Sequence, residues 1–231
     1  MKWSKIAGLD VIEVEAPENS EAIVILHGYG ADAKDLAPLA GELALSPPRH
    51  WYFLNAPLKL DGPVMIEGRM WFPIDMMELQ MSQQQGRPRD FLNKKIPEGF
   101  ESSMKMVHEF LEKISSHHEK ITLGGFSQGA MVASLAALRS KAPITKLLLF
   151  STTFAAENLW EKAFEERNFD FKVFQSHGTQ DPVLPVSEAQ RLASYLKEKG
   201  VDHEYHEFSG GHEISYEIIN KATEFLNQGH S

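Results

Sequence analysis

A serine stands between two glycines in residues 125–129, which read Gly-Phe-Ser-Gln-Gly. This G-x-S-x-G pattern follows the apolar run 121–123 and precedes residues 130–138, which have high helix propensity. In the order strand, sharp turn and helix, such a serine is held with its hydroxyl exposed at the edge of a sheet. Its neighbours must be small because other backbone passes close by. The pattern alone is common by chance, but this context favours Ser127 as a nucleophile.

A serine hydroxyl needs a base to remove its proton and a third group to orient that base. In hydrolases that use this turn, the chain order is serine, then an acid, then histidine. Asp181 follows the expected strand 171–175, and His212 follows the next expected strand, 203–208. Both therefore fall at the carboxyl ends of strands, where functional groups of parallel sheets gather. The sequence predicts Ser127, Asp181 and His212 as a catalytic triad.

Other histidines compete for the role of base. His177 lies in the same loop as Asp181, but the serine–acid–histidine order disfavours it. His203 and His206 fall in a polar strand and are expected to be solvated. They are also poor candidates for a metal site, because no third ligand is evident. We therefore expect no metal.

An acyl-transfer reaction also needs two hydrogen-bond donors for the oxyanion that forms on the substrate. The backbone N–H of Gln128, directly after the nucleophile, is expected to be one of them. The second is expected from the loop after an early strand. Residues 27–30 read His-Gly-Tyr-Gly and follow the apolar run 23–26, so they have the glycine content that this loop requires. An ordinary glycine turn is the alternative interpretation.

The surrounding sequence alternates short apolar runs with helical patterns, which is typical of an α/β fold with a mostly parallel sheet and helices on both faces. Runs such as 23–26 and 147–150 are apolar throughout, as strands covered on both faces are. The polar run 203–208 indicates an edge strand. Helical spacing predicts helices around 100–114, 189–196 and 214–225. Strands are expected at 9–15, 22–26, 51–55, 121–124, 146–150, 171–175 and 203–208.

Composition limits the classes of protein to which the chain can belong. Its 231 residues are 42% hydrophobic, enough for one sizeable core, so we expect a single domain over 1–231. The net charge of -9 argues against a nucleic-acid partner. The absence of cysteine excludes disulfides and thiolate zinc sites. No signal-peptide pattern and no apolar run of about 20 residues is found. We expect a cytoplasmic protein without a membrane span.

One segment, residues 62–89, has no clean periodicity and is rich in methionine and glutamine. Long irregular loops in compact domains often act as lids or binding loops. Its methionines can pack against acyl chains of varied shape, and Trp71 and Phe72 add apolar surface that should be exposed only to cover a groove or meet a partner. We expect Met70, Trp71 and Phe72 to contact medium or longer acyl chains. The alternatives are an excursion without a role and a homodimer interface.

These motifs together resemble the phospholipase/carboxylesterase family, which includes acyl-protein thioesterases and lysophospholipases. The resemblance spans nearly the whole chain. It implies an α/β-hydrolase fold, hydrolysis of carboxylic esters or thioesters through an acyl-enzyme, and the triad named above. It also implies an oxyanion hole made by the backbone N–H groups of Tyr29 and Gln128, no cofactor, and a hydrophobic acyl channel beside Trp71. The residues that carry it are 26–30, 55–57, 71–72, 124–129, 177–185 and 211–212.

Two features depart from the family pattern and concern the substrate. Pro73 and Ile74 separate the Trp-Phe pair from Asp75, and the methionine- and glutamine-rich stretch looks longer than usual. The expected substrate is a small-molecule or lipid ester, or an acylated protein. The alternatives are a lysophospholipase of the same fold and a catalytically silent protein that binds a ligand.

Overall fold

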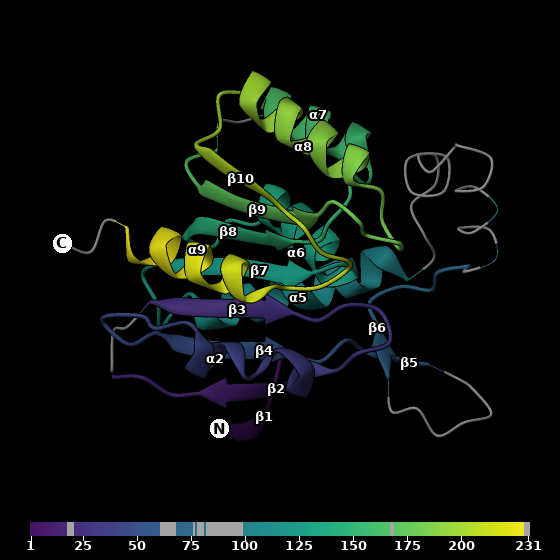
Figure 1. Cartoon of the computed structure of the whole chain (residues 1–231). Coiled ribbons are helices and arrows are strands. Elements are labelled where there is room, and N and C mark those ends of the chain that lie inside the picture. Colours follow the sequence, from purple (N-terminus) through teal and green to yellow (C-terminus); the bar gives the residue numbers. More distant parts are fainter. Residues whose placement is uncertain are drawn as a thin grey trace.

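The computed structural model describes residues 1–17, 21–60, 68–75, 77, 81, 99–166 and 169–228. Within these residues an 8-stranded sheet has the order β1-β2-β4-β3-β7-β8-β9-β10 (Figure 1). Strands β1 and β2 pair with each other antiparallel, and β2 also pairs antiparallel with β4. From β4 to β10 every neighbouring pair is parallel. The strands are β1 (Lys2–Ile6), β2 (Leu9–Val14), β3 (Ala22–Leu26), β4 (His50–Leu54), β7 (Ile121–Phe126), β8 (Ile144–Phe150), β9 (Lys172–Gly178) and β10 (His203–Phe208).

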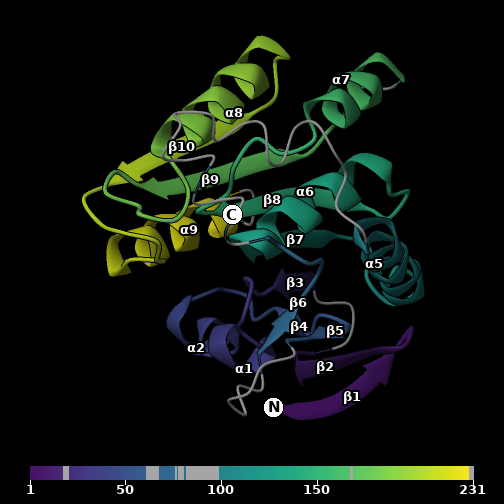
Figure 2. The ribbon, with the colours of Figure 1, turned by 90° about the vertical axis from the view of Figure 1, so that its right-hand side faces the viewer.

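Helices cover both faces of this sheet, as the sequence predicted. Figure 2 shows α1, α2 and α9 on one side and α5, α6 and α7 on the other. A short hairpin of β5 (Leu58–Lys59) and β6 (Arg69–Met70) forms a separate two-stranded sheet. The helices are α1 (Ala33–Leu36), α2 (Leu39–Glu42), α5 (Phe100–Ile114), α6 (Gln128–Arg139), α7 (Glu157–Glu166), α8 (Val186–Glu198) and α9 (Tyr216–Asn227).

The continuous apolar run of β3 is explained by its position in the middle of the sheet. Successive side chains of a strand point to opposite faces. Ala22, Val24 and Leu26 pack with the core that includes α5 and α6, whereas Ile23 and Ile25 pack with the core that includes α1, α2 and α9. Each face therefore requires apolar residues, and no position of the strand is left for a polar one.

The predicted strands 22–26 and 203–208 match β3 and β10, and β10 lies at the edge of the sheet as expected. The helix expected around 100–114 matches α5. Strands β1, β5 and β6 and helices α1, α2 and α7 were not predicted. In the described part of the chain, no helix combines the length and apolar character that crossing a membrane requires.

The turn after β7 packs closely against the end of β3. Leu26 pairs with Gly125 in the parallel register of these two strands. A Cβ placed on Gly125 would lie 2.7 Å from the carbonyl oxygen of Leu26. A Cβ on Gly129 would overlap the carbonyl oxygens of Leu26 and His27. The first turn of α6 can therefore touch β3 only because both positions lack a side chain.

We expect Gly129→Ala to destabilise the protein by about 1–3 kcal/mol, because the added methyl group must displace the backbone of β3. The free energy of unfolding in urea measures the effect. Gly41→Ala is a matched control, since a Cβ on Gly41 meets no atom within 4 Å and alanine favours the helix there. Equal stability changes in the two variants would contradict the close approach.

Candidate active site

Ser127 lies in the turn that joins β7 to α6, at the carboxyl edge of the sheet. Its φ of 54° and ψ of -118° are rarely adopted by a residue with a side chain, and such conformations cost of order 1–3 kcal/mol. The N–H of Ser127 donates to the carbonyl of Phe150 at 2.9 Å, which ties the turn to the end of β8. Strand, strained turn and helix therefore follow one another as the sequence predicted.

The structure brings Ser127, Asp181 and His212 together from three loops. His212 Nε2 lies 2.9 Å from Ser127 Oγ, and His212 Nδ1 lies 2.6 Å from Asp181 Oδ2. An ionised carboxylate can only accept, so Nδ1 carries the hydrogen and donates it to Asp181. In the neutral ring, Nε2 is then left to accept the hydrogen of the Ser127 hydroxyl. This is the arrangement that a base needs in order to activate a serine.

The side chain of Asp181 is fully buried and lies among hydrogen-bond donors. Its Oδ1 accepts the N–H groups of Val183 at 2.7 Å and Leu184 at 2.9 Å. Burial alone would raise the pKa of Asp181, but hydrogen bonds from His177, His212 and the Leu184 N–H outweigh burial and hold the pKa well below its ordinary range. Asp181 is therefore ionised wherever an imidazole titrates.

His177, which the sequence analysis weighed only as a base, contacts Asp181 and not Ser127 among the described residues. Its buried Nε2 lies 2.9 Å from the carbonyl oxygen of Leu184 and 3.3 Å from Asp181 Oδ2. A carbonyl only accepts, so Nε2 carries a hydrogen and points it at both oxygens. The carboxylate is thus held between two imidazoles, and only that of His212 reaches the nucleophile.

The glycine-rich loop after β3 lies directly beside the nucleophile. A Cβ on Gly28 would lie 3.4 Å from the Cβ of Ser127. His27 anchors this loop: its Nδ1 donates to the Gly28 carbonyl at 2.7 Å and its Nε2 accepts the N–H of Ala56 at 3.0 Å. Burial lowers the pKa of His27 although the Gly28 carbonyl opposes the change, so the ring stays neutral. The backbone of Tyr29 follows in the same loop.

Residues 69–72 fasten this loop to the start of α6. The carbonyl of Arg69 accepts the N–H of Gly30 at 2.8 Å, and the N–H of Arg69 donates to Ala31 at 2.9 Å. The Trp71 indole donates to the carbonyl of His27 at 2.9 Å. The segment 69–72 is therefore bonded to the glycine-rich loop through both backbone and side chain.

The Gln128 side chain holds the other end of this segment. Its Oε1 accepts the N–H of Trp71 at 2.8 Å, and its Nε2 donates to the carbonyl of Phe72 at 2.7 Å. The sequence predicts a role only for the backbone N–H of Gln128. Its amide in fact satisfies two buried backbone groups that lie more than fifty positions away in sequence.

The expectation that Trp71 and Phe72 present exposed apolar surface is wrong. Their exposed fractions are 0% and 1%, because the bonds to His27 and Gln128 draw both residues into the core. Truncating Trp71 would disturb the site for every substrate, not only for long acyl chains. Met70 is partly exposed in β6. Most of the segment 62–89 lies outside the described residues, so its role as a lid or an interface stays a prediction.

The two histidines of β10 also differ from expectation. The Nε2 atoms of His203 and His206 are buried, and neither has a hydrogen-bond partner among the described residues. Burial, together with the neighbouring His206, lowers the pKa of His203 to about 4. The expectation that His203 is solvated is therefore wrong. Within the described residues, no three histidine or carboxylate side chains are grouped as metal ligands.

The model of one protein family, described as phospholipase/carboxylesterase, matches residues 7–230. The chain belongs to this family. A relative named acyl-protein thioesterase 1 from Eremothecium gossypii is 28% identical, with 93% of this chain and 90% of the relative aligned. The protein of the same name from Candida albicans is 30% identical, with 94% and 97% aligned.

Solved structures agree with the family assignment. The crystal structure of esterase PE8 has a TM-score of 0.75 and 27% identity, and the match covers 98% of both chains. The structure of acyl-protein thioesterase 2 from Zea mays has a TM-score of 0.72 over 94% of this chain and 96% of that one. Its identity of 21% makes it a likeness of fold alone. This member of the phospholipase/carboxylesterase family thus has the α/β-hydrolase fold that the motifs implied.

In this family member, we expect Gln128→Ala to lower both stability and turnover. The change leaves the N–H of Trp71 and the carbonyl of Phe72 buried without partners, at a cost of about 1–3 kcal/mol. Turnover should fall as well, because residues 69–72 no longer hold the glycine-rich loop, although the backbone N–H of residue 128 is retained.

Urea unfolding and kcat on a p-nitrophenyl ester measure the two effects. Gln190→Ala is the matched control, since the Gln190 side chain makes an exposed bond to Glu207. It should change stability by less than about 0.5 kcal/mol. A Gln128→Ala protein with native stability and native kcat would contradict the positioning role of this amide.

Proposed function

We propose that this chain is a serine hydrolase that cleaves carboxylic esters or thioesters, with Ser127 as nucleophile, His212 as base and Asp181 as the orienting acid. The observation that carries the proposal is the continuous hydrogen-bonded path from Asp181 through His212 to Ser127. The path ends beside a glycine-rich loop at the carboxyl edge of the sheet, where active sites of α/β folds form. The family assignment supports the same reaction class.

In the proposed reaction, His212 Nε2 takes the proton of Ser127 as Oγ attacks the acyl carbon. The carbonyl oxygen becomes an oxyanion, for which we propose the backbone N–H groups of Tyr29 and Gln128 as donors. When the intermediate collapses, His212 gives the proton to the leaving oxygen or sulfur, and the acyl group stays on Ser127. Water then attacks the acyl carbon and gives a proton to His212. The bond between Ser127 Oγ and the acyl carbon breaks, His212 returns the proton to Oγ, and the carboxylic acid is released.

The chemistry of the acyl-enzyme is common to several substrates, and the names of the relatives favour a thioester. Both relatives described above are called acyl-protein thioesterase 1, so acylated proteins belong in the substrate panel beside small esters. The lysophospholipase alternative keeps the same triad and differs only in the leaving group. No metal or cofactor has a step in this mechanism. The chain contains no cysteine, which suits a reducing compartment, and we propose that it acts in the cytoplasm.

We expect Ser127→Ala to lower kcat by on the order of 10⁴-fold or more, because the nucleophile is lost. Stability should stay near native, since removing one hydroxyl in a turn opens no core cavity. Ser194→Ala, at an exposed helical position, is the matched control and should keep full activity. Labelling with a fluorophosphonate separates this enzyme from a silent ligand-binding protein. A native chain that is never labelled, or a Ser127→Ala chain that turns over at the native rate, would refute the assignment.

We expect His212→Ala to lower kcat/KM by on the order of 10⁴-fold or more, because no base then takes the proton of Ser127. The depressed pKa of Asp181 keeps that carboxylate ionised from mildly acidic to neutral pH, so protonation of Asp181 should not limit kcat/KM of the native chain in that range. Substitution of the exposed His117 by alanine should leave kcat/KM native. A His212→Ala chain that turns over at the native rate, with chemistry shown to be rate-limiting by burst kinetics, would count against His212 as the base.

A further inference from the structure

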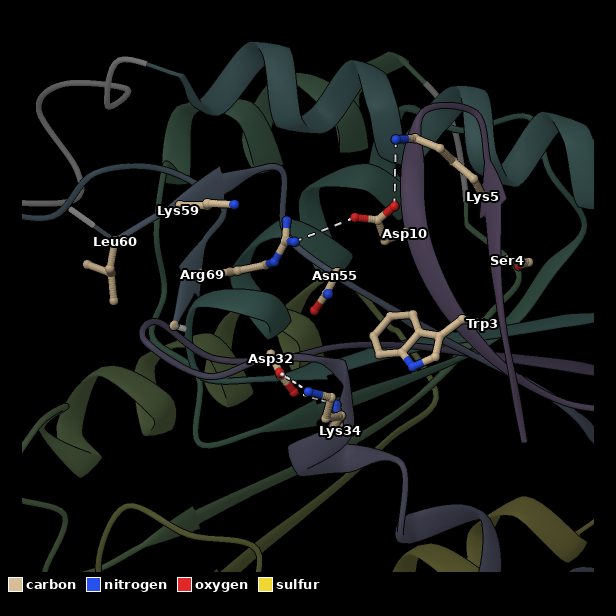
Figure 3. Close-up of a pocket in the computed structure, with 11 residues that line it drawn as sticks. Trp3, Ser4, Lys5, Asp10, Asp32, Lys34, Asn55, Lys59, Leu60 and Arg69 are labelled. Atoms are coloured by element: carbon tan, nitrogen blue, oxygen red, sulfur yellow. Dashed lines mark hydrogen bonds and ion pairs between the residues drawn. The ribbon is translucent and has the colours of Figure 1, made fainter. Parts of the chain in front are cut away.

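A cleft of about 830 Å³ lies between the first strands, α1 and the β5–β6 hairpin (Figure 3). Figure 3 shows Trp3 on one side of it and Lys59 and Leu60 on the other, with Asn55 between them. None of the proposed catalytic residues lines it. Its described lining residues are Trp3, Ser4, Lys5, Asp10, Asp32, Lys34, Asn55, Lys59, Leu60, Gly68 and Arg69.

The described lining of the cleft has more cations than carboxylates, although the chain is acidic. Among these described residues are four cationic side chains and two carboxylates, whereas the whole chain has a net charge of -9. No ion pair to Lys59 occurs in the part of the chain that the structure describes. Such a local excess of cations concentrates anions from solution. The charge of the cleft therefore selects for an anionic ligand.

The ion pairs inside the cleft are weak enough for a ligand to displace them. Asp10 lies 3.6 Å from the ammonium of Lys5 and 3.5 Å from the guanidinium of Arg69, and it is itself well exposed. Lys34 lies 3.6 Å from Asp32, whose carboxylate is also engaged as the cap of α1 through the N–H of Lys34 at 2.6 Å. The ammonium groups of Lys5 and Lys34 are well exposed, and exposed pairs of this length contribute about 0–1 kcal/mol each. The side chains of Lys5 and Lys34 can thus turn toward a phosphate at little cost.

Trp3 adds a flat apolar wall to this charged cleft. It is 50% exposed, whereas the other three tryptophans, Trp51, Trp71 and Trp160, are at most 3% exposed. An exposed indole beside cations suits a ligand in which an anion is joined to an apolar or planar part. A bare acyl chain, by contrast, would gain little among so many charges.

The cleft is connected to the proposed oxyanion loop through Arg69. The backbone of Arg69 bonds to Gly30 and Ala31, the residues that follow Tyr29, while its side chain lines the cleft. The cleft therefore borders the loop that carries Tyr29, the proposed oxyanion donor. We propose that the cleft binds the phosphate-bearing leaving group of a thioester or ester substrate. This inference rests on the proposed function and names the leaving-group chemistry of the same site.

Binding of the leaving group alone tests the cleft without catalysis. Trp3 is the exposed tryptophan of the chain, so its fluorescence should change as a ligand fills the cleft. We expect coenzyme A or glycerol 3-phosphate to give a saturable change, and neutral pantetheine to give none. The two phosphate compounds distinguish a nucleotide-bearing thiol from a glycerophosphate group, and inorganic phosphate tests the anion by itself.

The charge of the cleft is removed in the variant Lys34→Gln/Lys59→Gln. We expect its dissociation constant to rise about tenfold or more, the effect of losing roughly 1.4 kcal/mol of charge-assisted contact. Arg69 is left intact because it supports the oxyanion loop. The matched control is Lys105→Gln/Lys162→Gln, which removes two charges from exposed helical positions and should bind as the native chain does. No saturable response to either phosphate compound, or equal affinities in both variants, would overturn the proposal.

Kinetics then separate the cleft from the reaction. The ratio of kcat/KM for an acyl-coenzyme A over the same acyl-pantetheine, or for a lysophospholipid over the matching monoacylglycerol, should fall about tenfold in the cleft variant and stay native in the control. If these ratios are the same in native and cleft variants while the substrates are cleaved, the cleft proposal fails and the hydrolase stands. If nothing is cleaved but the phosphate compounds bind through Lys34 and Lys59, the hydrolase proposal fails and the anion site stands.

Discussion

The close approach of the turn after β7 to the end of β3 determines where every other part of the site can lie. Parallel pairing puts Leu26 beside Gly125, and the missing side chains of Gly125 and Gly129 let α6 begin against the backbone of β3. Ser127 and the loop that starts at His27 are thereby brought into contact. Ser127 and the candidate oxyanion donor Tyr29 come from segments about one hundred positions apart, so this contact has to be rigid to fix their separation.

Buried polar groups supply that rigidity. The amide of Gln128, the indole of Trp71 and the ring of His27 are all buried, and each makes hydrogen bonds with backbone groups. A buried polar group is costly without a partner, so a network in which each member is bonded has one favourable arrangement and many poor ones. The backbone of Ser127 is strained in this arrangement, and a strained conformation persists only where the surrounding contacts hold it in place.

The sequence predicted those features that depend on local pattern and chain order. The apolar run of β3 and the polar run of β10 identified a central and an edge strand, and the order Ser127, Asp181, His212 named residues that the structure brings together. It missed β1, whose five residues are mostly polar and, among the described strands, pair with β2 alone. Trp71 was expected at the surface but is buried. Nothing in the local sequence shows that an aromatic residue in an irregular segment is hydrogen-bonded to His27 and Gln128. Contacts between segments that are distant in sequence produce no periodic pattern of residues from which they could be predicted.

His27 and His212 illustrate how hydrogen-bond partners determine what an imidazole can do. In His27 both ring nitrogens are occupied by backbone groups, since Nδ1 donates to a carbonyl and Nε2 accepts an N–H. Neither nitrogen is available to exchange a proton with a substrate, so the ring has a structural role and holds the loop in place. In His212 one nitrogen faces the anionic Asp181 and the other faces a hydroxyl, so a proton that arrives on Nε2 is stabilised by the charge behind the ring. An imidazole can therefore be a structural support or a catalytic base, and its hydrogen-bond partners determine which role it has.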